Sequence, residues 1–315
     1  MLGNWHAGIA QITLSTPFAV GDVHAYLIKG DALTLVDAGV LTNEAWEQMQ
    51  HSFSELGIKI HDIDQIVLTH HHPDHVGLVE KFPQSTPVLA HPAADRWLYR
   101  TKDFADYHRE VFTEWFAEFG VPDEFSYYLD QLMSPLDYAC QRKLDIPLTD
   151  GMTLPLENDW VVLETPGHAT SHISLYREKD QILIGGDVLL NHISSNPILE
   201  PPFNKGEERH KPLLDYIHTL EDLAELNPLT VYPGHGEIMK GGVRELVEKR
   251  LKAQEERAFK VWDMLKENEN LSVFEICRKL FPHAYKTQLP LTISETVGQL
   301  DYIEAKFQIK DWNQT

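Results

Sequence analysis

The sequence predicts an α+β fold built from packed layers, with two helical additions. Strand patterns recur through the first 240 residues, and several end just before a histidine or aspartate in a loop marked by glycine or proline. Two other stretches, residues 95–145 and 241–312, carry apolar residues at helical spacing instead. We therefore expect a catalytic domain over residues 1–240 with a helical insertion at about 95–145, followed by a helical domain over residues 241–315.

The first third of the chain predicts strands around one helix. Residues 24–30 and 32–39 have strand patterns, with a hairpin turn at Gly30-Asp31. An amphipathic segment from Asn43 to Leu56 predicts a helix that ends at Gly57. The later strand patterns follow in order at residues 64–70, 87–92, 160–168, 172–178, 181–187 and 229–236.

The insertion at 95–145 is rich in aromatic residues, holding 12 of the chain's 31, and it shows no strand pattern. An aromatic stripe at helical spacing that ends at Gly120 predicts a helix. We expect this stripe to pack the insertion onto the catalytic domain. A second interpretation is a lid whose aromatic residues, Trp115 and Phe116 among them, line a substrate pocket. Both interpretations can hold together.

Residues 241–312 predict three helices, within 244–265, 272–281 and 293–307. Such a short run of helices suggests a compact terminal unit. We find no internal repeat and no low-complexity tract.

Composition and charge exclude some function classes. Two cysteines, Cys140 and Cys277, form no disulfide framework, which fits a reducing cytoplasm. The sequence has neither a long apolar run nor a signal-peptide pattern, so we expect a cytoplasmic protein without a membrane partner. The net charge of −21 lies on residues 1–240, because residues 241–315 hold 12 basic and 12 acidic residues. An acidic catalytic domain makes a nucleic-acid substrate unfavourable.

The stretch THHHPDHVG, residues 69–77, crowds together side chains that bind metals. His70 and His72 lie two apart at a predicted strand end, so their side chains project the same way. A proline then turns the chain, which can aim Asp74 and His75 at a second ion. Imidazole and carboxylate ligands suit zinc, iron or manganese.

Four ligands leave two ions short of full coordination, so further groups are needed at other strand ends. His168 in TPGH, Asp187 in IGGD and His235 in YPGHG each follow a strand pattern and lie beside glycine, which allows close backbone approach. A histidine-rich run by itself can be a surface loop that binds metal without function. Three further positions behind separate strands favour a metal centre.

These residues carry a resemblance to the metallo-β-lactamase superfamily. The run from Thr69 to His75 matches its T-H-x-H-x-D-H motif, and His168, Asp187 and His235 match its downstream ligand motifs in the expected order. Asp37, in LVDAG, matches the family's early aspartate, which either orients a ligand histidine or caps a turn.

The resemblance covers about residues 8–240 and implies a four-layer αβ/βα sandwich with two divalent metal ions, zinc in the first place. The resemblance implies that one ion is held by His70, His72 and His168, and the other by Asp74, His75 and His235. Asp187 would bridge the two ions. Asp74 would also orient the attacking water and move its proton. We expect His71 to point away without a catalytic role, whereas His192 follows Asp187 closely enough to reach a substrate pocket.

Departures from the family pattern indicate which branch of the superfamily this chain resembles. Secreted β-lactamases have cysteine where this chain has Asp187, and the flavin-linked di-iron oxidases have a carboxylate in place of His72. Glyoxalase II is similar in its ligands, but its glutathione-binding pattern is not recognisable here. The PGHG form of the last ligand and the helical tail resemble the branch around beta-lactamase-like protein 2, whose tail is similar to a winged helix.

We therefore predict a binuclear metallohydrolase that uses a metal-bridging hydroxide on a small ester, thioester or lactone, with a homodimer as a possible assembly. An endoribonuclease or another phosphodiesterase on the same metals is the alternative within this chemistry. A binding protein that keeps the metals without turnover is the alternative from another class.

Overall fold

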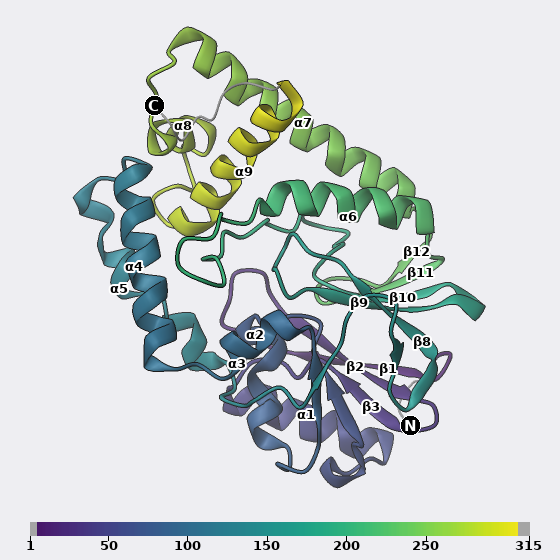
Figure 1. Cartoon of the computed structure of the whole chain (residues 1–315). Helices are drawn as coiled ribbons and strands as arrows, with labels where there is room; N and C mark the ends of the chain where they lie inside the picture. The colour runs from purple at the N-terminus through teal and green to yellow at the C-terminus, as the bar shows by residue number, and fades with distance from the viewer. Residues whose placement is uncertain (1–4, 308–315) are drawn as a thin grey trace.

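The computed structural model describes residues 5–307, and two six-stranded sheets form its centre (Figure 1). In the first sheet the strands follow chain order: β1 Ile9–Leu14, β2 Val23–Lys29, β3 Leu33–Val36, β4 Gln65–Val67, β5 Val88–Ala90 and β6 Ile146–Pro147. In the second sheet they run from β12 back to β7: β7 Thr153–Leu154, β8 Glu157–Glu164, β9 Ile173–Arg177, β10 Ile182–Gly186, β11 Thr230–Pro233 and β12 Met239–Lys240.

Strand directions bring the polar strand ends together. Strands β3 to β6 are parallel, and β8, β10 and β11 share one direction because the antiparallel β9 lies between β8 and β10. Backbone hydrogen bonds join the two sheets at these ends: Ile173 donates to the carbonyl of Thr69 at 2.8 Å, and His24 donates to the carbonyl of Gly234 at 2.7 Å. The loops after these strands therefore meet at one rim of the sandwich.

Helices cover the outer face of each sheet and complete four layers. Between the sheets, Tyr26 and Trp160 are buried in a shared apolar core. Helix α1 (Asn43–Leu56) buries Met49 and Phe53 against the first sheet. Helices α6 (Pro212–Leu226) and α7 (Val243–Glu267) pack over the second sheet (Figure 1). The predicted αβ/βα sandwich is confirmed.

Local sequence signals set the helix ends. Helix α1 begins after Thr42, whose hydroxyl accepts a hydrogen bond from the backbone of Ala45, and it ends at Gly57 with φ at 71°. A four-residue helix, α2 (Pro73–Val76), opens with proline, whose missing N–H would have no helical partner there in any case. This short helix carries the end of the histidine-rich motif.

The insertion is helical, as predicted, and lies at one side of the sandwich (Figure 1). Its α-helices are α3 (Asp95–Leu98), α4 (Lys102–Glu118) and α5 (Tyr127–Asp130). Its apolar side chains form one buried cluster with those of the C-terminal helices α8 (Val273–Leu280) and α9 (Leu289–Phe307). The insertion thus packs on the tail as well as on the catalytic domain.

The C-terminal unit consists of α7, α8 and α9 as far as the structure describes it. Residues 243–307 contain no strand, so the predicted helices are confirmed and the likeness to a winged helix is not. The patterns at 9–14 and 212–226 form β1 and α6, which the sequence analysis did not predict. Among the described residues, no helix combines the length and apolar character that crossing a membrane requires.

Candidate metal centre

The rim where the strand ends meet gathers all seven expected ligands. His70 and His72 follow β4, whereas Asp74 and His75 lie on α2. The remaining three come from the second sheet, after β8, β10 and β11 respectively: His168, Asp187 and His235. Their nitrogen and oxygen atoms form three mutually close groups with every separation within 4.8 Å: His70, His72 and His168; His70, His75 and Asp187; and Asp74, His75 and His235.

Four of these histidines are oriented by hydrogen bonds on their outer nitrogens. Nδ1 of His168 lies 2.9 Å from the carbonyl of Asn196, and Nδ1 of His235 lies 2.7 Å from the carbonyl of Asp22. A carbonyl only accepts, so each Nδ1 carries a proton and each Nε2 is the nitrogen left to bind a metal.

His70 and His75 are oriented through one carboxylate. Nδ1 of His75 lies 2.8 Å from Oδ2 of Asp37. The hydroxyl of Thr69 donates to the same oxygen at 2.8 Å and accepts from Nδ1 of His70 at 3.0 Å. The backbone N–H of Thr69 donates to the other oxygen at 2.7 Å. Asp37 therefore orients both rings.

The inward-facing atoms are buried and lack hydrogen-bond partners. They are Nε2 of His75, Nε2 of His168, Nε2 of His235 and Oδ1 of Asp187. Burying unpaired polar atoms costs free energy, on the order of 1–3 kcal/mol each. Four such atoms in one cluster, all of types that bind metals, are explained when divalent cations lie among them.

Asp187 lies between histidines of both expected ligand sets. Its Oδ2 is 3.6 Å from Nε2 of His168 and 3.5 Å from Nε2 of His235, and its Oδ1 is 3.4 Å from Nε2 of His75. Burial raises the pKa of Asp187, but the histidines beside it lower that pKa well below its usual range. Burial also lowers the pKa of His235, but the carboxylates of Asp187 and Asp74 raise that pKa to about 10.

Glycine allows the strand ends to approach this closely. A Cβ atom on Gly234 would lie 2.2 Å from Oδ1 of Asp187 and 2.7 Å from Cε1 of His75. Only glycine therefore fits before His235. The glycine-marked loops of the sequence thus have a steric cause.

His172, which accepts a hydrogen bond from the backbone of Asp187, was not predicted from the sequence. The backbone N–H of Asp187 donates to Nε2 of His172 at 3.1 Å, and the opposite nitrogen lies 2.8 Å from the hydroxyl of Thr165. Burial lowers the pKa of His172 to about 3, so the ring is neutral and accepts from Asp187. His172 lies inside a strand pattern, so the pattern did not indicate a contact with the site. Its closeness in sequence to His168 was the feature that could have indicated one.

His71 belongs to none of the three close groups, and its ring contacts the insertion. Its Nδ1 lies 2.8 Å from the hydroxyl of Ser171. Its ring stacks on Trp97 with centroids 4.3 Å apart and planes 8° from parallel.

A pocket of about 190 Å³ lies directly beside His71 and His72. Residues of the insertion, of the segment 198–200 and of α9 form its other walls. The walls are mostly apolar: they include Trp97, Phe112, Leu132, Met133, Pro135, Leu136, Ile198, Leu199, Pro290 and Leu291. Its described lining includes no lysine and no arginine.

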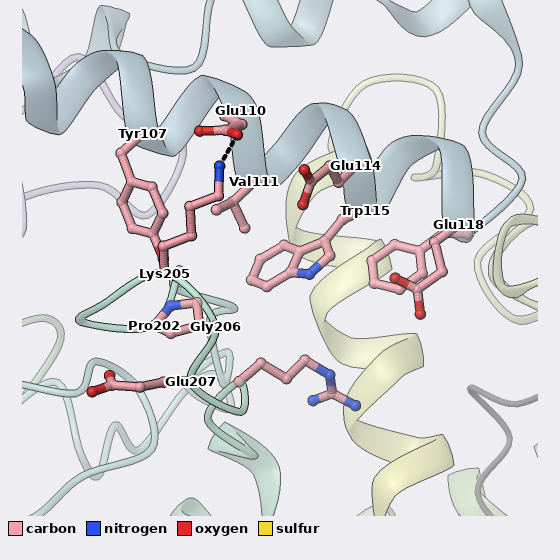
Figure 2. A pocket seen from close by; sticks show the side chains of 12 residues that line it. Tyr107, Glu110, Val111, Glu114, Trp115, Glu118, Pro202, Lys205, Gly206 and Glu207 are labelled. Carbon is pink, nitrogen blue, oxygen red and sulfur yellow. Dashed lines mark hydrogen bonds and ion pairs between the residues drawn. The ribbon is translucent and has the colours of Figure 1, made fainter.

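The expected pocket residues Trp115 and Phe116 lie elsewhere. Positions four apart share a helix face, so α4 turns His108 and Phe112 toward the pocket beside the centre. Trp115 faces the loop at 202–209 across a separate acidic hollow of about 370 Å³, which Figure 2 shows. Phe116 is buried in the cluster shared with the C-terminal helices.

His192 does not line this pocket either. It is exposed and lies against Gly236, where an added Cβ would be 2.5 Å from its Nδ1. The two aromatic residues of the insertion that border the pocket, Trp97 and Phe112, were not singled out from the sequence.

Comparison with known proteins agrees with this geometry. Residues 19–235 match the family model described as "Metallo-beta-lactamase superfamily". The chain is 42% identical over 304 residues to the probable metallo-hydrolase YqjP of Bacillus subtilis, covering 96% of this chain and 94% of the relative. It is 26% identical over 269 residues to the beta-lactamase-like protein 2 homolog of Caenorhabditis elegans, covering 84% of this chain and 72% of the relative.

A solved structure is similar over nearly the whole chain. The metallo-beta-lactamase family protein from Thermus thermophilus superposes with a TM-score of 0.78 at 26% identity, covering 96% of this chain and 95% of that one. The similarity thus includes the insertion and the C-terminal helices as well as the sandwich.

Metal uptake by metal-free protein should release protons. His235, with its pKa near 10, is a charged imidazolium at pH 8, whereas a histidine must be neutral to bind a metal. We expect at least one proton released per chain at pH 8, and less as the pH rises through about 10. Calorimetric titration with zinc in HEPES and in Tris should give enthalpies that differ by the number of protons released multiplied by the difference between the two buffers' ionisation enthalpies.

The His51→Ala variant is the control, because His51 is exposed and lies outside the cluster. This variant should release as many protons on zinc binding as the wild-type protein does. Equal enthalpies in the two buffers would contradict the assignment of His235.

Proposed function

The chain belongs to the metallo-beta-lactamase superfamily and is a metal-dependent hydrolase, and on that premise we propose that it hydrolyses a small ester, thioester or lactone with two divalent ions. The observation that carries the substrate class is the apolar pocket that borders His71 and His72. A pocket so close to the centre can hold the acyl part of a substrate while its carbonyl faces the ions.

We assign the ligands from the close groups and their orientation. One ion would be held by His70, His72 and His168. The other would be held by Asp74, His75 and His235. Asp187 would bridge them, since its two oxygens approach histidines of both sets. Imidazole and carboxylate donors favour zinc, with iron or manganese as the alternatives.

The bound ions would polarise the scissile carbonyl and lower the pKa of a water molecule. The protein supplies the proton path. Asp74, 7% exposed, has Oδ2 at 3.3 Å from Nε2 of His235, so its carboxylate faces the reaction space. The water oxygen bonds to the carbonyl carbon, the bond to the leaving oxygen or sulfur breaks, and Asp74 carries the water's proton to the leaving group.

Charge and lining favour an acyl substrate over RNA. Binding a polyanion relies on lysine and arginine next to phosphates, and the pocket's described lining has neither, whereas it includes the buried carboxyl of Glu200. The net charge of −21 acts in the same direction. An engineered cavity of roughly 150 Å³ binds benzene, so the pocket's volume of about 190 Å³ fits a ring or a short alkyl chain.

Replacing the bridging carboxylate tests the two-ion assignment. Asp187→Asn removes a charge shared by both ions, so we expect fewer than two metals per chain and a loss of activity of at least about a hundredfold. Elemental analysis together with an ester assay measures both. Asp263→Asn, on the exposed surface of α7, is the matched control and should keep two metals and full activity. An Asp187→Asn protein with two metals and normal turnover would refute the bridge.

A substrate panel tests the acyl assignment. Metal-loaded protein should hydrolyse at least one ester, thioester or lactone and lose that activity with a chelator, and it should leave single-stranded RNA intact at physiological salt. Phe112→Ala removes a wall of the pocket, so KM should rise about tenfold for hexanoyl substrates and much less for acetyl substrates. Phe259→Ala, 42% exposed on α7, is the control. Metal-dependent RNA cleavage without any acyl turnover would decide for the phosphodiesterase.

A further inference from the structure

The loop that follows β10 carries one expected metal ligand and orients another. It begins at Asp187, whose carboxylate lies between histidines of both ligand sets. At its far end, the carbonyl of Asn196 accepts from Nδ1 of His168 at 2.9 Å. The hydroxyl of Ser195 donates to the backbone carbonyl of Asp187 and so closes the loop on itself. The conformation of residues 187–196 therefore sets two groups of the metal centre at once.

The middle of this loop is held by few contacts of its own. Residues 187–200 form neither helix nor strand. Among the described residues, the backbone of 189–196 makes no hydrogen bond to another backbone group. None of residues 191–194 is buried, and the side-chain amide of Asn191 reaches the carbonyl of Glu237 only at 3.3 Å. The carbonyls of the loop therefore need partners from side chains elsewhere or from water.

Arg250 of α7 is such a partner. Its Nη2 donates to the carbonyl of Leu190 at 3.1 Å and to the carbonyl of Ile193 at 2.6 Å. This nitrogen carries two hydrogens, so it can serve both carbonyls at the same time. Hydrogen bonds from a charged donor are stronger than those between neutral groups. One side chain of the C-terminal unit thus holds the turn that lies between Asp187 and Ser195.

We infer that Arg250 is a positioning residue of the metal centre. Its two hydrogen bonds hold the loop in the conformation that presents the carboxylate of Asp187 to the ions and the carbonyl of Asn196 to His168. The inference rests on the ligand assignment of the proposed function, but it needs no acyl substrate. A guanidinium donates hydrogen bonds and binds no cation, so Arg250 acts on the ions through the loop alone.

The two ions depend on this loop to different degrees. One ion depends on it through both Asp187 and His168. The other depends on it through Asp187 alone, because Nδ1 of His75 pairs with Asp37 and Nδ1 of His235 pairs with a carbonyl outside the loop. Releasing the loop should therefore weaken binding of the ion at His168 more than binding of the ion at His235.

Cobalt(II) reports on both sites without any turnover. Metal-free protein is titrated with cobalt while the visible absorption, which depends on the ligand geometry, is recorded. In Arg250→Ala we expect one binding step to weaken by about ten- to a hundredfold, the range for lost partners of metal ligands, and the other by less than about threefold. The absorption bands of the weakened step should shift. This step should be the one that His168→Ala abolishes.

Arg244→Ala is the matched control. Arg244 lies on the same helix, and its Nε donates to the carbonyl of Ala224 at 2.9 Å, but that carbonyl belongs to α6. Its loss removes an arginine-to-carbonyl bond between elements without touching the loop, so it shows what a purely structural change does. Both cobalt steps and their bands should remain as in the wild-type protein.

Two further variants keep the test open if Arg250→Ala does not fold. Arg250→Lys keeps a cation but loses the planar fork of donors, so the same cobalt step should weaken to a smaller extent. Ser195→Ala breaks the hydrogen bond to the carbonyl of Asp187, which frees the loop at its other tie. It should weaken the step that Arg250→Ala weakens.

A folded Arg250→Ala protein whose cobalt affinities and bands match the wild type overturns the inference, even if its melting temperature falls. The result is separable from the proposed function. If no ester, thioester or lactone is hydrolysed but the His168 step weakens in Arg250→Ala, the acyl assignment fails and the positioning role stands. If acyl substrates are hydrolysed and cobalt binding by Arg250→Ala is unchanged, the positioning role fails and the proposed function stands.

Discussion

The carboxylate of Asp37 is the contact on which the metal centre depends. It accepts from the backbone and hydroxyl of Thr69 and from Nδ1 of His75, and through Thr69 it also orients His70. Asp37 itself has φ at 60°, a conformation that non-glycine residues rarely adopt. The chain after β3 thus adopts a locally strained conformation where one buried carboxylate orients both His70 and His75.

The rest of the sandwich brings the remaining ligands to Asp37. Parallel strands within each sheet place their carboxyl ends at one rim, and backbone hydrogen bonds between Ile173 and Thr69 and between His24 and Gly234 join the rims. Glycine before His235 lets the backbone pass within contact of Asp187. The insertion and the C-terminal helices together wall an apolar pocket beside His72.

The sequence indicated which polar side chains would meet at the rim because they follow strand patterns or, for Asp74 and His75, the proline turn after one. It predicted the helix at 43–56 because Thr42 and Gly57 mark its ends. It could not tell which aromatic residues of α4 border the pocket, since several share one broad side of that helix, and Trp115 was expected where Phe112 lies. The stacking of His71 on Trp97 joins distant segments, which periodicity does not detect. Helix α6, by contrast, had a readable pattern, with proline in its first turn and apolar residues at helical spacing.

Anomalous diffraction from crystals of zinc-loaded protein, recorded on both sides of the zinc absorption edge, tests the central claim most directly. We expect two peaks per chain. One would lie among His70, His72 and His168, the other among Asp74, His75 and His235, and Asp187 would contact both. A single peak, or peaks outside this cluster, would contradict it.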